Sequence, residues 1–165
     1  MKDYRQQLLA AYEQYADALF RYCYVRLQDR ELAKDAVQEA YTRTWRWLTD
    51  GNEPRNLRAL LYRTAANISI DELRRGRTES LDALTEQGAD IADPSATDPS
   101  VAARLAEALT LVNRLEPKYR DALLMRHVDD MPVKDIAIVL GESENAVSVR
   151  IHRAIAKLKE LHDHA

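Results

Sequence analysis

The residues best suited to chemistry with a ligand lie near the C-terminus, in the segment GESENAVSVRIHRAIAKLKEL from Gly141 to Leu161. Ala137, Gly141 and Val147 have the spacing of a helix-turn-helix. That motif needs a small residue where two helices cross, a glycine that reverses the chain, and a branched apolar residue that packs the second helix on the first. The spacing therefore predicts a DNA-binding motif whose second helix is capped by Ser143.

The second helix of this motif has a polar, partly basic face opposite its apolar stripe. The N-terminal half of a recognition helix contacts base edges in the major groove, and basic side chains further along contact phosphates. An ordinary solvated helix with scattered charges is the alternative interpretation. The residues predicted to contact DNA are Asn145, Ser148, Val149, Arg150, His152, Arg153 and Lys157.

Composition predicts the class of fold that positions this motif. The chain has 165 residues with four glycines and one phenylalanine, and alanine, leucine, glutamate and arginine are common, which favours helix over sheet. The net charge of −3 is concentrated in residues 79–100, which contain acidic and no basic side chains together with two Asp-Pro steps. We therefore expect an all-α protein with helical domains at 1–78 and 101–165, joined by an acidic flexible linker at 79–100.

Apolar residues spaced by three or four predict the helices of each domain. In the first domain they predict a three-helix bundle with helices at about 4–28, 30–49 and 55–75, in which Tyr12 faces inward and Trp45 and Trp47 anchor the core. In the second domain they predict four helices, at about 101–115 and 117–129, then from Pro132 and from Ser143. Gly141 is expected to end the third of these in a left-handed conformation.

Several classes of function have no support in the sequence. Cys23 is the only cysteine, so no internal disulfide is expected, and its place in a helical stripe predicts a buried, inert thiol. No secretion signal or membrane-spanning stretch is recognisable, which predicts a cytoplasmic protein that is not inserted in a membrane. Without a glycine-rich phosphate loop or a cluster of metal-ligating residues, we expect no enzyme activity, cofactor, metal or small-molecule substrate.

Three segments, in order, carry a family resemblance. DAVQEAYTRTWRWL (35–48) and LLYRTAANISIDELRR (60–75) resemble sigma-factor region 2, and LEPKYRDALLMRHVDDMPVKDIAIVLGESENAVSVRIHRAIAKLKE (115–160) is similar to region 4. Their order and the chain length resemble the extracytoplasmic-function (ECF) group of the sigma-70 family. The resemblance implies a sigma factor that binds core RNA polymerase and directs promoter recognition, melting and transcription initiation.

The resemblance also implies roles for residues in the first domain. One face of the helix at 30–49 is expected to bind the clamp helices of the largest polymerase subunit, through Asp35, Gln38, Glu39, Thr42 and Arg46. The following loop and helix are expected to contact the minus-ten promoter element, with the loop capturing an unstacked base. These minus-ten residues are Asp50, Asn52, Glu53, Asn56, Arg63, Asn67, Arg74 and Arg75.

In the second domain the resemblance assigns the recognition helix to the minus-thirty-five element. Here the sequence departs from the family, because Ser148 and Val149 replace a basic residue and a serine of the usual run. An anti-sigma factor is expected as a further partner. Two alternatives remain open: a sigma-like mimic that sequesters an anti-sigma factor, which the altered run favours, and a free-standing helix-turn-helix regulator.

Overall fold

The computed structural model describes residues 3–79 and 98–164, apart from the side chains of 77–79 and 105. All regular elements in these ranges are helices, as the composition predicted. The predicted linker falls mainly on residues 80–97, which lie outside the described part of the chain. The helices on either side, α3 and α4, extend by one or two residues into the range assigned to the linker.

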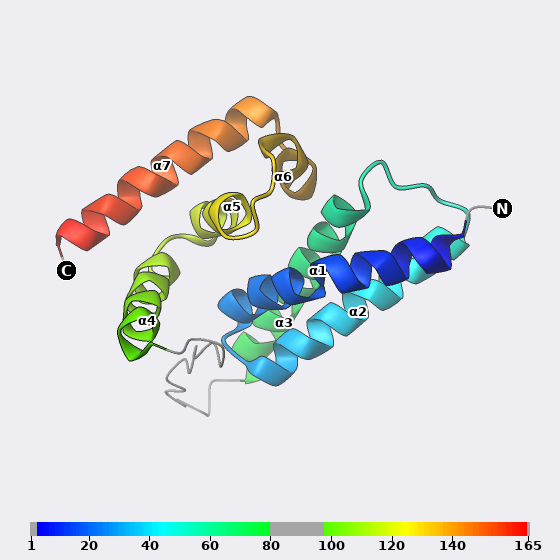
Figure 1. Cartoon of the computed structure of the whole chain (residues 1–165), viewed down its shortest axis with the longest axis horizontal. Helices are drawn as coiled ribbons and strands as arrows, with labels where there is room; N and C mark the ends of the chain where they lie inside the picture. Colours follow the sequence, from blue (N-terminus) through cyan, green and yellow to red (C-terminus); the bar gives the residue numbers. More distant parts are fainter. Residues whose placement is uncertain (1–2, 80–97, 165) are drawn as a thin grey trace.

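The N-terminal domain consists of α1 (Tyr4–Leu27), α2 (Arg30–Thr49) and α3 (Leu57–Glu79), which pack side by side (Figure 1). Local chemistry sets their ends. The Asp3 side chain caps α1 by accepting a hydrogen bond from the backbone N–H of Gln6. The Asp29 side chain caps α2 in the same way, by accepting one from the backbone N–H of Leu32. The third helix begins two residues later than the sequence predicted, because the Asn56 side chain accepts a hydrogen bond from the backbone N–H of Ala59 at 3.0 Å.

The core of this domain contains the apolar stripes that the spacing predicted. Leu19, Cys23, Ala33, Ala40 and Leu61 are fully buried. Three aromatic predictions were wrong, however. Tyr12 is 54% exposed, and Trp45 and Trp47 are 39% and 37% exposed. Tyr12 and Trp45 line an apolar hollow that opens to solvent beside the α1–α2 contact, so they border the core without filling it.

The thiol of Cys23 is buried, as predicted, and burial raises its pKa to about 11. Because only the thiolate is nucleophilic, we expect alkylation of the folded protein at pH 8 to be at least roughly 100-fold slower than alkylation of the denatured chain. Mass spectrometry after timed exposure to iodoacetamide measures both rates. Equal rates would show that the thiol is accessible in the native state.

The C-terminal domain consists of α4 (Pro99–Asn113), α5 (Pro117–His127), α6 (Val133–Leu140) and α7 (Glu144–Asp163). Proline at the first position begins α4 and α5. Gly141 ends α6 with φ of 67°, and Ser143 caps α7 by accepting a hydrogen bond from Ala146 at 3.1 Å, both as predicted. The two domains also contact each other, since α3 packs against α6 and α1 against α5 (Figure 1).

Candidate functional site

The polar face of α2 lies opposite its buried stripe of Ala33, Val37, Ala40, Thr44 and Leu48. The side chains predicted to bind polymerase all reach the surface. Those that are exposed are Asp35, Gln38 and Arg46, while Glu39 and Thr42 are partly exposed. This helix face is therefore accessible to a partner. The predicted binding of polymerase requires such an accessible face.

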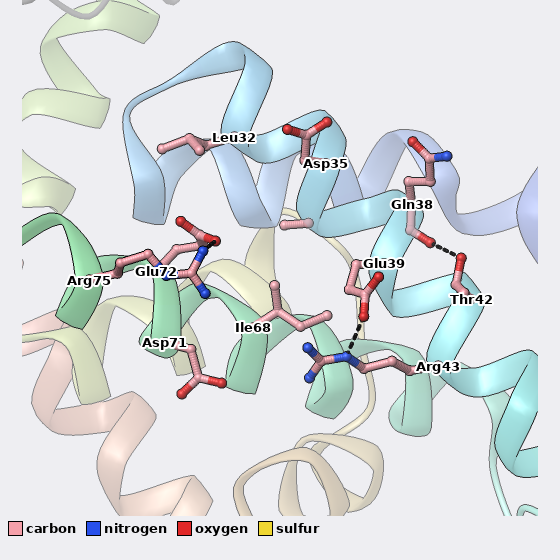
Figure 2. A pocket seen from close by; sticks show the side chains of 11 residues that line it. Leu32, Asp35, Gln38, Glu39, Thr42, Arg43, Ile68, Asp71, Glu72 and Arg75 are labelled. Atoms are coloured by element: carbon pink, nitrogen blue, oxygen red, sulfur yellow. Dashed lines mark hydrogen bonds and ion pairs between the residues drawn. The ribbon is translucent and has the colours of Figure 1, made fainter.

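A groove of about 430 Å³ lies between this face of α2 and the C-terminal half of α3 (Figure 2). Its polar walls carry more carboxylates than guanidinium groups. Each of the two helices has a salt bridge between residues about one turn apart. Arg43 pairs with Glu39 in α2 at 2.7 Å, and Arg75 pairs with Glu72 in α3 at 3.0 Å. The residues that line it are Leu32, Asp35, Ala36, Gln38, Glu39, Thr42, Arg43, Ile68, Asp71, Glu72 and Arg75.

Sequence reasoning missed three charged residues of this groove: Arg43, Asp71 and Glu72. The spacing of Glu39 and Arg43 by one helical turn was a usable signal for the first of them. Nothing in the sequence indicated that α3 places Asp71 and Glu72 beside α2, because that depends on the packing of two helices.

The α3 residues predicted to contact the minus-ten element separate into two groups. Arg63, Asn67 and Arg74 recur at four and seven residues, so they share one exposed face of the helix. Arg75 points instead toward α2, where it lies in the groove and pairs with Glu72 (Figure 2). The structure therefore brings Arg63, Asn67 and Arg74 together as a candidate DNA-contacting face and places Arg75 beside the candidate polymerase-binding residues.

In the loop before α3, two of the four predicted residues form bonds that shape the loop itself. Asn52 donates from Nδ2 to the carbonyl of Trp47 at 2.8 Å, and the Asn56 side chain caps α3. Asp50 and Glu53 extend into solvent. The exposed carboxylate of Asp50 can accept a hydrogen bond from the amino group of an unstacked base. The side-chain oxygen of Asn56 already accepts one from the backbone of Ala59.

The helix-turn-helix has the packing that its spacing predicted. Val147 is fully buried and Ala137 is 7% exposed, so the small and branched residues meet where α6 and α7 cross. Arg150 forms a half-buried ion pair with Glu142, which joins α7 to the turn. This pair stabilises the relative orientation of the two helices.

The outer face of α7 is exposed along the predicted DNA-contacting residues. Ser148 and Arg150 are partly buried, and the exposed members of the set are Asn145, Val149, His152, Arg153 and Lys157. The Lys157 Nζ lies 5.2 Å from the centre of the Tyr119 ring, a cation–π contact that positions this exposed ammonium group. The N-terminal half of α7 thus presents a mixed polar, basic and apolar surface that can contact bases and phosphates.

Two further classes of site have no candidate within the described ranges. No group of three or more His, Cys, Asp or Glu side chains there could hold a metal ion. Among the same residues, no helix has the length and apolar character that a membrane crossing requires.

These features define a class of protein: an all-α chain in which one domain carries a polar groove beside a candidate DNA-contacting helix and the other a helix-turn-helix. The sigma-70 region 2 family model matches residues 11–79, and the sigma-70 region 4 model matches residues 105–158.

Full-length comparisons agree with these matches. The ECF RNA polymerase sigma factor SigW of Bacillus subtilis is 28% identical over 162 residues, covering 90% of this chain and 86% of SigW. The RNA polymerase sigma-E factor of Streptomyces avermitilis is 32% identical over 146 residues, covering 87% of this chain and 78% of that protein. BldN of Streptomyces coelicolor, also an ECF sigma factor, is longer, and this chain spans 58% of it at 29% identity.

Among solved structures, the sigma factor RpoE of Bartonella quintana, crystallised with the anti-sigma factor NepR, has the same fold. It superimposes with a TM-score of 0.75 over 99% of this chain and 98% of the other, at 23% identity. The chain belongs to the sigma-70 family, in its extracytoplasmic-function group. It is a sigma factor, a subunit that directs RNA polymerase to promoters.

Proposed function

We propose that the groove between α2 and α3 binds the clamp helices of the largest subunit of core RNA polymerase. The exposed polar face of α2 is the single observation that supports this most directly, because it offers a straight, hydrogen-bonding surface to a preformed helical pair. The excess of carboxylates in the groove favours a partner with basic side chains. In this proposal Asp35, Gln38, Glu39, Thr42 and Arg46 are the contact residues.

The two DNA-contacting faces have separate tasks in the proposal. Domain 1–78 contacts the minus-ten element through the loop before α3 and through Arg63, Asn67 and Arg74, with the loop trapping an unstacked base. Domain 101–165 contacts the minus-thirty-five element through α7. Holding an unstacked base requires energy of a few kcal/mol, which polymerase and loop together supply.

An inhibitory partner is also part of the proposal. The similar RpoE structure contains an anti-sigma factor, NepR, bound to a chain of the same fold. We propose that an anti-sigma factor likewise binds this chain and that the protein acts in the cytoplasm.

Run-off transcription with purified core polymerase on a library of promoter sequences tests the proposed function. Enriched start sites that share two sequence elements would support it. Binding to core polymerase without any transcript would favour the alternative of a sigma-like mimic that sequesters an anti-sigma factor. The observation that favours this alternative is the run at Ser148–Val149, where a basic residue of the usual family sequence is replaced. Tight sequence-selective DNA binding without polymerase would favour the free-standing regulator.

Replacing Arg153 by alanine is expected to lower transcription from promoters that depend on the minus-thirty-five element by roughly tenfold. Its guanidinium is exposed on the outer face of α7, and a contact to a guanine edge stabilises binding by about 1–3 kcal/mol. Run-off yields measure the loss on such promoters. The exposed Lys159→Ala, further from the N-terminus of α7, is the matched control. Unchanged output from every promoter would show that Arg153 lies away from DNA.

A further inference from the structure

Two lysines from different helices of the C-terminal domain meet at one aromatic ring. The Nζ of Lys118, at the start of α5, lies 4.9 Å from the centre of the Tyr119 ring, and the Nζ of Lys157, in α7, lies 5.2 Å from it. Both lysines are exposed, whereas Tyr119 is only 8% exposed. A buried ring therefore supports two accessible positive charges, and Lys118 was not among the residues predicted to contact DNA.

The apolar core of the domain sets the position of this ring. Tyr119 belongs to a buried cluster with Val112, Leu115, Leu123 and Ala154, to which α4, α5 and α7 all contribute. The ring is therefore held in place before any partner binds. A flexible lysine loses conformational entropy when it is ordered on binding, and a ring that restricts it beforehand lowers that cost.

The charges around the ring favour an anionic partner. Two ammonium groups that each lie about 5 Å from one point are at most about 10 Å apart, so they repel each other. Glu116 approaches Lys118 at 3.8 Å, but its side chain is 61% exposed, and exposed pairs of this kind are weak. An anion that contacts both ammonium groups removes their repulsion.

The backbone of a DNA strand matches this spacing. Each strand carries one phosphate per about 3.4 Å of helix axis, so two lysines within about 10 Å of each other can contact neighbouring phosphates. Lys157 lies one helical turn beyond Arg153, about 6 Å along α7, and half the width of the major groove is also about 6 Å. When Arg153 contacts a base edge, Lys157 and the adjacent Lys118 reach the phosphates at the border of the groove.

We propose that Lys118 and Lys157 form a phosphate-binding site for the backbone of the minus-thirty-five DNA, and that Tyr119 is the positioning residue that holds both. This inference rests on the proposed contact of α7 with the minus-thirty-five element. An ammonium group contacts a phosphate as a point charge, so the site reads no bases. It fixes the orientation of α7 in the groove, and the exposed residues of the N-terminal half of α7 then read the sequence.

The salt dependence of promoter binding tests the two lysines in the holoenzyme formed from this chain and core polymerase. The logarithm of the affinity falls linearly with the logarithm of the salt concentration, with a slope of about 0.9 per phosphate contacted. Lys118→Gln and Lys157→Gln should each reduce this slope by about 0.9 and weaken binding at about 0.1 M salt by up to roughly tenfold. The loss should be the same for every minus-thirty-five sequence, because no base contact is removed.

Two controls isolate the site. Lys34→Gln removes an exposed lysine of α2 in the N-terminal domain, so it changes the net charge equally and should keep the slope of the parent chain. A promoter fragment that ends just downstream of the minus-thirty-five element leaves α7 without DNA. On this shortened fragment the two lysine variants should bind like the parent.

Substitutions of Tyr119 separate positioning from a purely structural role. Tyr119→Phe retains the ring and should match the parent, whereas Tyr119→Leu removes the ring and should weaken promoter binding at least roughly threefold. In a chain that already carries Lys118→Gln and Lys157→Gln, the same change to leucine should have no further effect, because the ring acts through the lysines. Far-UV circular dichroism checks that the helices persist in each variant.

Unchanged salt slopes in both lysine variants would overturn the proposal. So would an equal loss of binding on the shortened fragment, or a Tyr119→Leu effect that persists without the lysines. Weaker binding of the lysine variants to core polymerase in the absence of DNA would assign the lysines to an acidic protein surface, and would also overturn it. In these outcomes the parent holoenzyme still binds promoters, so the proposed function stands. A parent holoenzyme that selects no promoter would contradict the proposed function and this inference together.

Discussion

Replacing Asp35 by arginine is expected to weaken binding to core RNA polymerase at least roughly tenfold while leaving the fold unchanged. Asp35 is exposed on α2 and lines the groove together with Glu39, Asp71 and Glu72 (Figure 2). Reversing its charge places a cation where the groove favours basic groups of the partner, and like charges across an interface cost several kcal/mol. Transcription from every promoter should fall together, because docking precedes promoter selection.

Asp17→Arg is the matched control, because Asp17 is an exposed acid on α1 outside the groove. It changes the net charge by the same amount. Fluorescence anisotropy of the labelled chain titrated with core polymerase measures both affinities, and far-UV circular dichroism checks the fold. Equal weakening by the two variants would mean that overall charge, and not this groove, determines binding.

Introducing aspartate at two valines of α7 is expected to give opposite phenotypes. Val147 is fully buried where α6 and α7 cross, whereas Val149, two residues on, is 40% exposed. Val147→Asp places an unpaired charge in the core, which should destabilise the C-terminal domain by at least about 3 kcal/mol. Val149→Asp should leave stability within about 0.5 kcal/mol of the parent and abolish minus-thirty-five recognition, because its carboxylate faces the DNA phosphates.

Thermal unfolding followed by circular dichroism separates these two effects. Val147→Asp should lose helical signal or unfold at a clearly lower temperature, and Val149→Asp should unfold like the parent. Transcription from a promoter without a minus-thirty-five element should then persist in Val149→Asp. Equal destabilisation by the two substitutions would contradict the assignment of inner and outer faces on this helix.

The sequence by itself determined the local features of this protein. Apolar residues spaced by three or four located all seven described helices, because a helix buries one stripe of its surface whatever its neighbours are. Ser143 and Gly141 marked the start of α7 and the end of α6, because caps and left-handed residues depend on nearby backbone groups only. The spacing of Ala137, Gly141 and Val147 likewise determined the helix-turn-helix.

Only the tertiary structure decided features that depend on how far-separated helices pack. Trp45 and Trp47 have the apolar area of core residues, yet both are exposed, because their burial depends on how far neighbouring helices cover α2. Arg75 lies in the groove and not beside Arg74, because the rotation of α3 against α2 sets its direction. Arg26 and Asp121 are of residue types that usually lie at the surface, and only the contact between the two domains buries them as an ion pair. The spacing of apolar residues predicts the direction of a side chain relative to its own helix. Whether a charged side chain is buried depends on which residues, distant in the sequence, pack against that helix.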